Sequence, residues 1–228
     1  MLINKADKIF IAGARGMVGS AIKRKLNIKG YENLESPTRD ELDLTKTELV
    51  FEWFRKIQPS VVIIAAAKVG GIYANNKYPV DFLLENLKIQ NNIIEAAWKN
   101  NAKRLLFLGS SCIYPKNSKQ PIKEEELLKS ELEKTNEWYA LAKISGIKIC
   151  QALRKQHGFD AISLMPTNLY GEGDNYHEKN SHVLPALLKR FHSHKLANKN
   201  ILYCWGSGKP RREFLHVEDL AEASIFAL

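Results

Sequence analysis

The sequence predicts an α/β fold of the Rossmann type: a doubly wound parallel sheet followed by a smaller C-terminal lobe. Two observations predict it. Short apolar runs alternate with longer segments of helical length, and a glycine-rich turn stands at the first strand-to-helix junction. The chain has 228 residues, of which 45% are hydrophobic and 26% charged, which is enough for one core and a small appendage.

The strand and helix predictions follow from apolar spacing. Near-continuous apolar runs suit a parallel sheet that is covered on both faces, and the segments between them have helical periodicity. Gly158 is expected to close the last of these helices. The expected strands are residues 8–12, 61–64, 104–108 and 161–165, and the expected helices are residues 18–27, 46–57, 80–98 and 138–156.

The character of the chain changes after Pro166. A polar, glycine-bearing stretch leads into a short amphipathic helix from Val183 to about Ser193. We therefore expect residues 1–166 and 213–228 to form the Rossmann domain. Residues 167–212 are expected to form part of a substrate-binding lobe over the carboxyl edge of the sheet.

Hydropathy and cysteine spacing exclude several classes of protein. No run approaches the roughly 18 apolar residues of a membrane span, so we expect a soluble protein without a membrane partner. Three cysteines without CxxC spacing make neither a disulfide framework nor a zinc site, and a reducing cytoplasm is the economical location. His192 and His194 are two apart on an expected helix and point away from each other, so no metal is expected.

The net charge of +9 raises the question of nucleic-acid binding. However, the 34 basic residues are dispersed, and no RNA- or DNA-binding motif is present. We expect no nucleic-acid partner. A solvated basic surface and an anionic small-molecule substrate are the two remaining explanations.

The segment "IFIAGARGMVGSAI" carries the first chemical motif. Gly13, Gly16 and Gly19 follow an expected strand directly and open the expected helix 18–27, and Met17 and Val18 are expected to bind the cofactor with them. Dinucleotide binding needs a tight turn, a backbone that can approach the pyrophosphate, and amides at a helix N-terminus. The spacing therefore predicts a dinucleotide site.

The end of the second strand selects the dinucleotide. "LESPTRDEL" places Arg39 there, and Arg15 lies within the glycine loop. Two guanidinium groups can hold a 2′-phosphate, which favours NADP. The alternative is that Arg39 pairs with a neighbouring carboxylate, Asp40 or Glu41, while Glu35 binds the ribose of NAD.

The segment "NEWYALAKIS" carries the second motif. Tyr139 and Lys143 are four residues apart, so they share one helix face, and an ammonium near a phenol is expected to lower the phenol pKa. Ser110 stands at the tip of the fourth strand. Together the three residues resemble the Ser-Tyr-Lys triad of the short-chain dehydrogenase/reductase superfamily.

Further motifs resemble one family within that superfamily. They are "FIAGARGMVGSAI", "AAAKVGGIYANN", "FLGSSCIYPK", "MPTNLYG", "NSHVLPALLKRF" and "WGSGKPRREFLHVEDLA". Over essentially the entire chain the sequence is similar to the GDP-L-fucose synthase family. The resemblance implies epimerisation of GDP-4-keto-6-deoxy-D-mannose at carbons 3 and 5, followed by NADPH-dependent reduction at carbon 4.

The resemblance also implies catalytic roles. Cys112 would be the base and His182 the acid of the epimerisation, while Ser110 and Tyr139 would bind the carbonyl oxygen and Lys143 would also hold the nicotinamide ribose. Without the resemblance, a cysteine near a strand end is most often a small buried apolar residue, and a histidine on a polar loop is usually a solvated one. His177 is the rival of His182, and the other cysteines, Cys150 and Cys204, are expected to be structural.

For the GDP-sugar, the resemblance points to residues that flank the expected lobe helix, each of which also has a structural explanation. An aromatic face can stack on guanine, and a guanidinium can bind a diphosphate. The expected substrate-binding residues are Asn168, Val183, Leu187, Arg190, Trp205 and Arg212.

Further expectations concern the oligomeric state and the C-terminal end of the sequence. The resemblance implies a homodimer formed through residues 80–98 and 138–156. The sequence stops within an expected helix, "EASIFAL", where family members continue, so we expect a truncated form. Two other functions stay open: another nucleotide-sugar 4-epimerase or 4-reductase of the same superfamily, and a non-catalytic NADP-binding scaffold.

Overall fold

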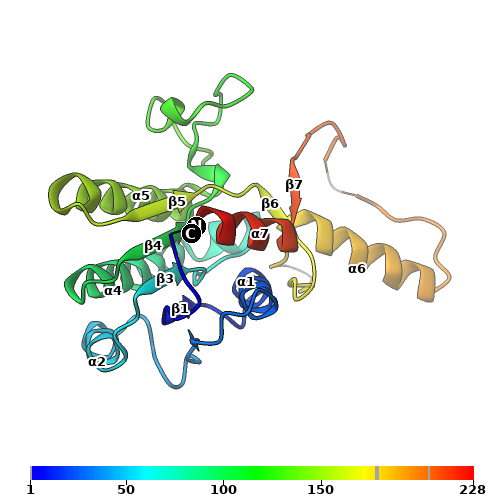
Figure 1. The fold of residues 1–228 in the computed structure, drawn as a ribbon. Helices are drawn as coiled ribbons and strands as arrows, with labels where there is room; N and C mark the ends of the chain where they lie inside the picture. Colours follow the sequence, from blue (N-terminus) through cyan, green and yellow to red (C-terminus); the bar gives the residue numbers. More distant parts are fainter. Residues whose placement is uncertain (1, 178–179, 205) are drawn as a thin grey trace.

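A five-stranded parallel sheet forms the centre of the molecule (Figure 1). The computed structural model describes residues 2–177, 180–204 and 206–228. The sheet order is β2-β1-β3-β4-β5, so the direction of winding reverses between β1 and β3. A crevice at such a reversal, outside the carboxyl ends of the strands, is where open α/β sheets bind dinucleotides. The strands are β1 (Ile9–Ala12), β2 (Leu34–Glu35), β3 (Val61–Ile64), β4 (Arg104–Leu108) and β5 (Ala161–Leu164).

Helices cover both faces of this sheet, as the apolar runs predict. In β1, Ile9 and Ile11 pack towards one pair of helices, while Phe10 and Ala12 pack towards the opposite set. The alternation follows from the two-residue repeat of a strand. The first pair is α1 (Met17–Ile28) and α7 (Val217–Ala227), and the opposite set is α2 (Thr47–Ile57), α4 (Asn86–Lys99) and α5 (Glu137–His157).

Most of the predicted elements are confirmed. β3 and β4 have the predicted bounds, and α5 ends at Gly158, whose φ of 67° is the left-handed conformation that glycine adopts readily. The helix predicted over residues 80–98 is present, but not as a single regular α-helix. That segment begins with a π-helical turn, η1 (Asp81–Glu85), which runs directly into α4. The short helix α3 (Ile72–Lys77) was not predicted.

Asn86 joins this π-helical turn to the loop that follows β3. Its side-chain oxygen accepts a hydrogen bond from the Lys68 amide at 2.8 Å. Its side-chain nitrogen donates to the carbonyl oxygens of Lys68 and Phe82, at 3.0 and 2.6 Å. Asn86 is buried, so these bonds are sheltered from water and fix the loop against the start of α4.

The rest of the chain forms a parallel pair of strands and a helix that extends to one side (Figure 1). The pair is β6 (Asn168–Tyr170) and β7 (Phe214–His216), and the helix is α6 (Val183–Leu196). Residues 201–204 are not in a strand, and Cys204, which was expected to be structural, is exposed. Two 3₁₀ turns, η2 (Ser111–Ile113) and η3 (Glu124–Glu126), lie between β4 and α5. No helix within the described residues is both long and apolar enough to cross a bilayer.

Candidate active site

The glycine loop has the geometry that a dinucleotide requires. Gly13 has a φ of 83°, and a Cβ there would lie 2.7 Å from the amide nitrogen of Ala66. A Cβ at Gly19 would collide with the carbonyl oxygen of Gly13, whereas one at Gly16 would meet only that oxygen, at 3.5 Å. Gly16 caps α1 without a side-chain hydrogen bond, so the first amides of the helix can face an anion. Packing therefore requires two of the glycines, and the third keeps the approach to the helix open.

Three basic residues surround the end of β2. Arg15 is exposed, and its charge contributes to the lowered pKa of Glu41, after the hydrogen bonds from Thr38. Arg39 forms an ion pair with Glu85 at 3.7 Å, so the alternative in which it pairs with Asp40 or Glu41 is not what the structure contains.

The third basic residue is Lys23 of α1, which the sequence analysis missed. Its ammonium donates to the hydroxyl of Ser36 at 2.7 Å, directly after β2. The available signal was its position one helical turn after Gly19, on the helix that opens at the glycine loop. Three cations where the adenosine ribose of a dinucleotide would lie fit a 2′-phosphate.

The four central residues of the predicted active site lie together. Ser110 follows β4, and its hydroxyl accepts a hydrogen bond from the Cys112 amide at 3.4 Å. The Cys112 thiol is also hydrogen-bonded to Ser110 and lies within electrostatic range of Lys143. The Lys143 ammonium donates to the Leu108 carbonyl at 2.7 Å and lies 5.6 Å from the centre of the Tyr139 ring. Ser111, between Ser110 and Cys112, lies in the η2 turn and is exposed.

Burial controls the ionisation of these groups. It raises the pKa of Tyr139, and the nearby Cys112 adds to that rise. The expectation that Lys143 lowers the phenol pKa is therefore wrong for this state, because desolvation outweighs the ammonium. Burial also lowers the pKa of Lys143 to about 8. It raises the pKa of Cys112, against the opposing effects of Ser110 and the Lys143 charge.

Two phenylalanines that the sequence analysis missed border these groups. The Phe82 ring meets the Tyr139 ring edge-on, with 6.5 Å between their centres. The Phe107 ring lies beneath the Lys143 ammonium, 4.8 Å away. No sequence signal separates these residues from ordinary core aromatics, because the tertiary fold alone decides which polar groups they meet.

His182 occupies the N-cap position of α6. Its neighbour Asn180 accepts a hydrogen bond from the Gly71 amide at 3.1 Å, and a Cβ at Gly70 would lie 3.1 Å from Phe82. Desolvation lowers the pKa of His182, while the carboxylate of Asp174 opposes that change. Among the described contacts, none joins His182 to Cys112 directly. The rival His177 is exposed, and its carbonyl accepts a hydrogen bond from Ser181 at 3.1 Å.

The expected substrate residues lie on three segments beside this region. Val183, Leu187 and Arg190 lie on α6, and Arg190 donates to the Tyr203 carbonyl. Asn168 of β6 donates to the Glu213 carbonyl at 3.0 Å, next to the exposed Arg212. No described contact brings these five to Ser110 or Tyr139, and the sixth, Trp205, lies outside the described residues.

A hollow of about 280 Å³ opens between the two regions. Lys68 and Phe82 contribute to one side of it, and Asn175 and Asn180 to the other. Phe82 also contacts Tyr139, so the hollow lies next to the central residues. A space of this size beside the reactive groups can admit part of a small-molecule substrate.

The remaining cysteines and the histidines suggest no further chemistry. Cys150 is buried on α5 and hydrogen-bonded to Ser163, and burial raises its pKa to about 12, which suits a structural residue. The described residues contain no group of three His, Cys, Asp or Glu side chains that could hold a metal ion.

Known proteins are similar to this chain over nearly its entire length. The model of the NAD dependent epimerase/dehydratase family matches residues 9–228. GDP-L-fucose synthase 1 of Arabidopsis thaliana is 60% identical over 225 residues, which cover 99% of this chain and 70% of that protein. GDP-L-fucose synthase of Escherichia coli K12 is 56% identical, over 97% of this chain and 69% of that protein.

A solved structure extends the comparison. GDP-mannoheptose C4 reductase from Campylobacter jejuni with NADP bound is 36% identical, with a TM-score of 0.90, over 99% of this chain and 75% of that one. It shares the fold at lower identity than the two synthases. The chain therefore belongs to the NAD dependent epimerase/dehydratase family and, within it, to the GDP-L-fucose synthases.

Proposed function

We propose that this protein is an NADPH-dependent epimerase and reductase that converts GDP-4-keto-6-deoxy-D-mannose to GDP-L-fucose. The observation that carries the proposal is the position of Cys112 beside Ser110, Tyr139 and Lys143. A reductase needs only the last three. A thiol beside them gives the same site a group that can move a proton on carbon.

The cofactor is NADPH, which supplies hydride to carbon 4 when bound. Gly13, Gly16 and Gly19, together with the helix residues Met17 and Val18, form the cradle for its pyrophosphate. Arg15 and Arg39 are the candidates for its 2′-phosphate, with Lys23 as a third. Lys143 also takes the role of holding the nicotinamide ribose.

Each active-site residue has a separate role in the epimerisation. A ketone at carbon 4 acidifies the protons on carbons 3 and 5, because the resulting carbanion delocalises onto oxygen. Cys112 removes such a proton, and His182 supplies one to the opposite face. Ser110 and Tyr139 donate hydrogen bonds to the oxygen that gains charge.

The same residues serve the reduction. Because burial keeps the Tyr139 phenol protonated, it holds the proton that the carbonyl oxygen takes up as carbon 4 is reduced. Lys143 lies one helical turn further along α5, and its ammonium balances charge that develops beside it. One group of side chains thus performs both reactions.

The nucleotide end of the substrate belongs to the second lobe in this proposal. Residues 167–212 form part of that lobe, and residues 1–166 and 213–228 form the NADP-binding domain. The exposed Arg212 is available for the diphosphate. The residues proposed to bind the GDP-sugar are Asn168, Val183, Leu187, Arg190, Trp205 and Arg212.

We also propose that the protein is a homodimer in the cytoplasm. The exposed apolar side chains of Val80 and Leu84, at the start of the segment 80–98, and of Trp138 and Leu141, within 138–156, support a homodimer through these helices. The three cysteines are free, which supports a reducing compartment such as the cytoplasm.

Solvent exchange tests the proposal. In deuterated water the keto sugar should gain deuterium at carbons 3 and 5, and NADPH consumption should follow. Cys112→Ser should suppress exchange at least about a hundredfold while cofactor binding is retained. Cys150→Ser is the matched control, because it changes a thiol that lies away from the triad.

The outcomes separate the alternatives. Exchange that persists in Cys112→Ser would exclude Cys112 as the base. A protein that acts at carbon 4 without exchange at carbons 3 and 5 would be better described as a 4-epimerase or 4-reductase. Binding of NADPH without either exchange or oxidation would favour a non-catalytic scaffold.

A further inference from the structure

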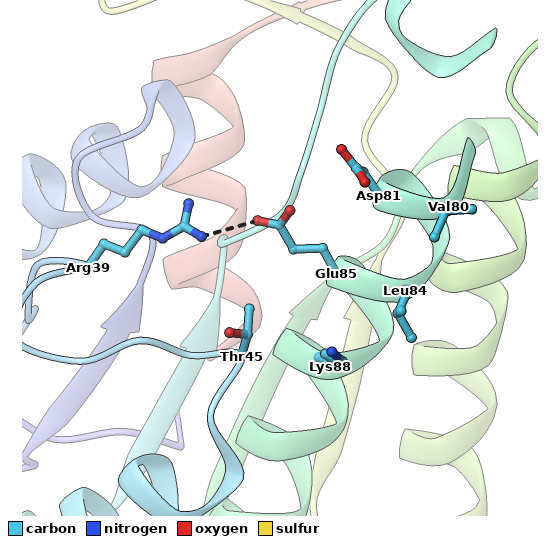
Figure 2. A pocket seen from close by; sticks show the side chains of 7 residues that line it. All are labelled: Arg39, Thr45, Val80, Asp81, Leu84, Glu85 and Lys88. Carbon is cyan, nitrogen blue, oxygen red and sulfur yellow. Dashed lines mark ion pairs between the residues drawn. The ribbon is translucent and has the colours of Figure 1, made fainter. Parts of the chain in front are cut away.

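A second pocket, of about 230 Å³, lies between the loop after β2 and the beginning of α4. Figure 2 shows Arg39 and Thr45 on the loop side, and Glu85 on the helix side with its carboxylate directed at the Arg39 guanidinium. The same loop carries Ser36, which is bonded to Lys23. The pocket is therefore next to the basic residues that we assign to the 2′-phosphate.

The two side chains of the ion pair that crosses this pocket differ in their exposure to solvent. The Nη2 of Arg39 lies 3.7 Å from the Oε1 of Glu85, which is beyond hydrogen-bonding distance. The side chain of Arg39 is 75% exposed, whereas that of Glu85 is 24% exposed. The carboxylate is thus the fixed half, and the guanidinium is free to exchange one anion for another.

Glu85 also pairs with a second cation, so little stability is lost when Arg39 leaves Glu85 and binds another anion. The Lys68 ammonium lies 3.3 Å from its other carboxylate oxygen, Oε2. Lys68 is anchored through its backbone to Asn86, the residue after Glu85. If Arg39 leaves, Glu85 keeps Lys68, so no unpaired carboxylate is left at the edge of the pocket.

We propose that Glu85 sets how strongly this protein prefers a 2′-phosphorylated cofactor, by competing with the 2′-phosphate for the guanidinium of Arg39. The proposal rests on the role of Arg39 in the proposed function. Glu85 is then a specificity-determining residue that weakens NADP binding, and it has no such effect on NAD, which lacks the phosphate.

Equilibrium binding tests this inference without turnover. Titration of the protein with NADP⁺ and with NAD⁺ by calorimetry gives both dissociation constants. Glu85→Gln keeps the size of the side chain and removes the competing charge. We expect it to tighten NADP⁺ binding by about two- to fivefold, within the range expected for an exposed ion pair. NAD⁺ binding should change by less than about twofold.

Glu95→Gln is the matched control, because Glu95 is exposed on the same helix and the change in net charge is identical. Glu95 lies ten residues after Glu85, about 15 Å away along the helix axis at the rise of an α-helix. This variant should leave both dissociation constants unchanged. An equal gain in Glu95→Gln would reduce the effect to net charge and overturn the proposal.

Arg39→Ala separates this inference from the assignment of Arg39 itself. Arg39→Ala alone should weaken NADP⁺ binding, and adding Glu85→Gln to it should then give no further gain. The inference fails if Glu85→Gln leaves NADP⁺ affinity unchanged, tightens NAD⁺ equally, or gives its full gain without Arg39. Unchanged NADP⁺ affinity in Arg39→Ala would instead remove Arg39 from the cofactor site.

Discussion

The Lys143 ammonium lies over the face of the Phe107 ring, 4.8 Å from its centre. Both residues are buried, so little water competes for the charge. A ring face attracts a cation and the Leu108 carbonyl accepts its hydrogen bond, so the two together stabilise the charged form of Lys143 against the burial that lowers its pKa to about 8.

Phe107→Leu should therefore move the pH dependence of catalysis. Loss of a desolvated cation–π contact is expected to lower the Lys143 pKa by roughly one unit. Because the ammonium is lost as the pH rises through that pKa, the alkaline limb of NADPH oxidation should move to lower pH. Cys112 and Tyr139 also titrate beside Lys143, but neither loses a ring contact. The measurement is the pH profile of kcat/KM.

Phe54→Leu is the control for this change. Phe54 is fully buried against Phe10 and Trp53, in the same core cluster as Phe107 but among apolar groups. Both variants should lose stability to a similar extent, and only Phe107→Leu should shift the profile. A common shift would show that the profile reports general loosening of the core.

Gly146→Ala tests how closely α5 must approach β4. A Cβ at Gly146 would lie 2.5 Å from Cζ of Phe107, and the ring has no space to withdraw because it is fully buried. We expect a loss of about 1 to 3 kcal/mol in the free energy of unfolding, together with a lower kcat. Urea denaturation measures the first effect. Lys148→Ala, which is exposed on the same helix, should cost much less.

The three glycines of the first loop should respond differently to alanine. Gly16→Ala should leave stability nearly unchanged and weaken NADPH binding at least about tenfold, because its methyl group would meet the cofactor and not the protein. Gly19→Ala should instead lower the melting temperature, since its Cβ would collide with the Gly13 carbonyl. Equal loss of stability in both variants would contradict this division of roles.

The epimerisation should depend on pH in a bell shape. Its active form needs the Cys112 thiolate and the protonated His182. Burial raises the Cys112 pKa above its ordinary 9.0, and desolvation lowers the His182 pKa below its ordinary 6.5. Both groups are thus mostly in the wrong form at neutral pH.

The rate of deuterium exchange, followed as kcat/KM, should accordingly be low and flat around neutrality. It should fall below the His182 pKa as the thiolate is depleted, and above the Cys112 pKa as the imidazolium is depleted. A His182→Asn variant that keeps the same two limbs would exclude His182 as the acid.

The sequence predicted the fold well where local pattern and tertiary environment agree. The bounds of β3 and β4 match because all of their residues are buried, so apolar runs and strands coincide. The π-helical turn before α4 was not predicted, because a π-helical turn and an α-helical turn have the same apolar pattern and differ only in their backbone hydrogen bonds.

The active site likewise has residues whose positions could be predicted from the sequence and properties that depend on the tertiary fold. The four-residue spacing of Tyr139 and Lys143 places both on one helix face, and spacing alone could predict it. The direction of the Tyr139 pKa could not be predicted, because it depends on burial by Phe82 and its surroundings. Lys23 and Glu85 were missed for a related reason: each contacts a segment that is distant in sequence.

The packing of α7 against α1 has a consequence for synthesis on the ribosome. On the helical side, the apolar face formed by β1 and α1 is covered by Val217, Ala221 and Ile225 of α7. These residues are translated long after α1, so the first strand and helix must wait with that face uncovered. Nascent chains of this protein should therefore bind chaperones until α7 emerges, and the glycine loop next to that face should become ordered only late in translation.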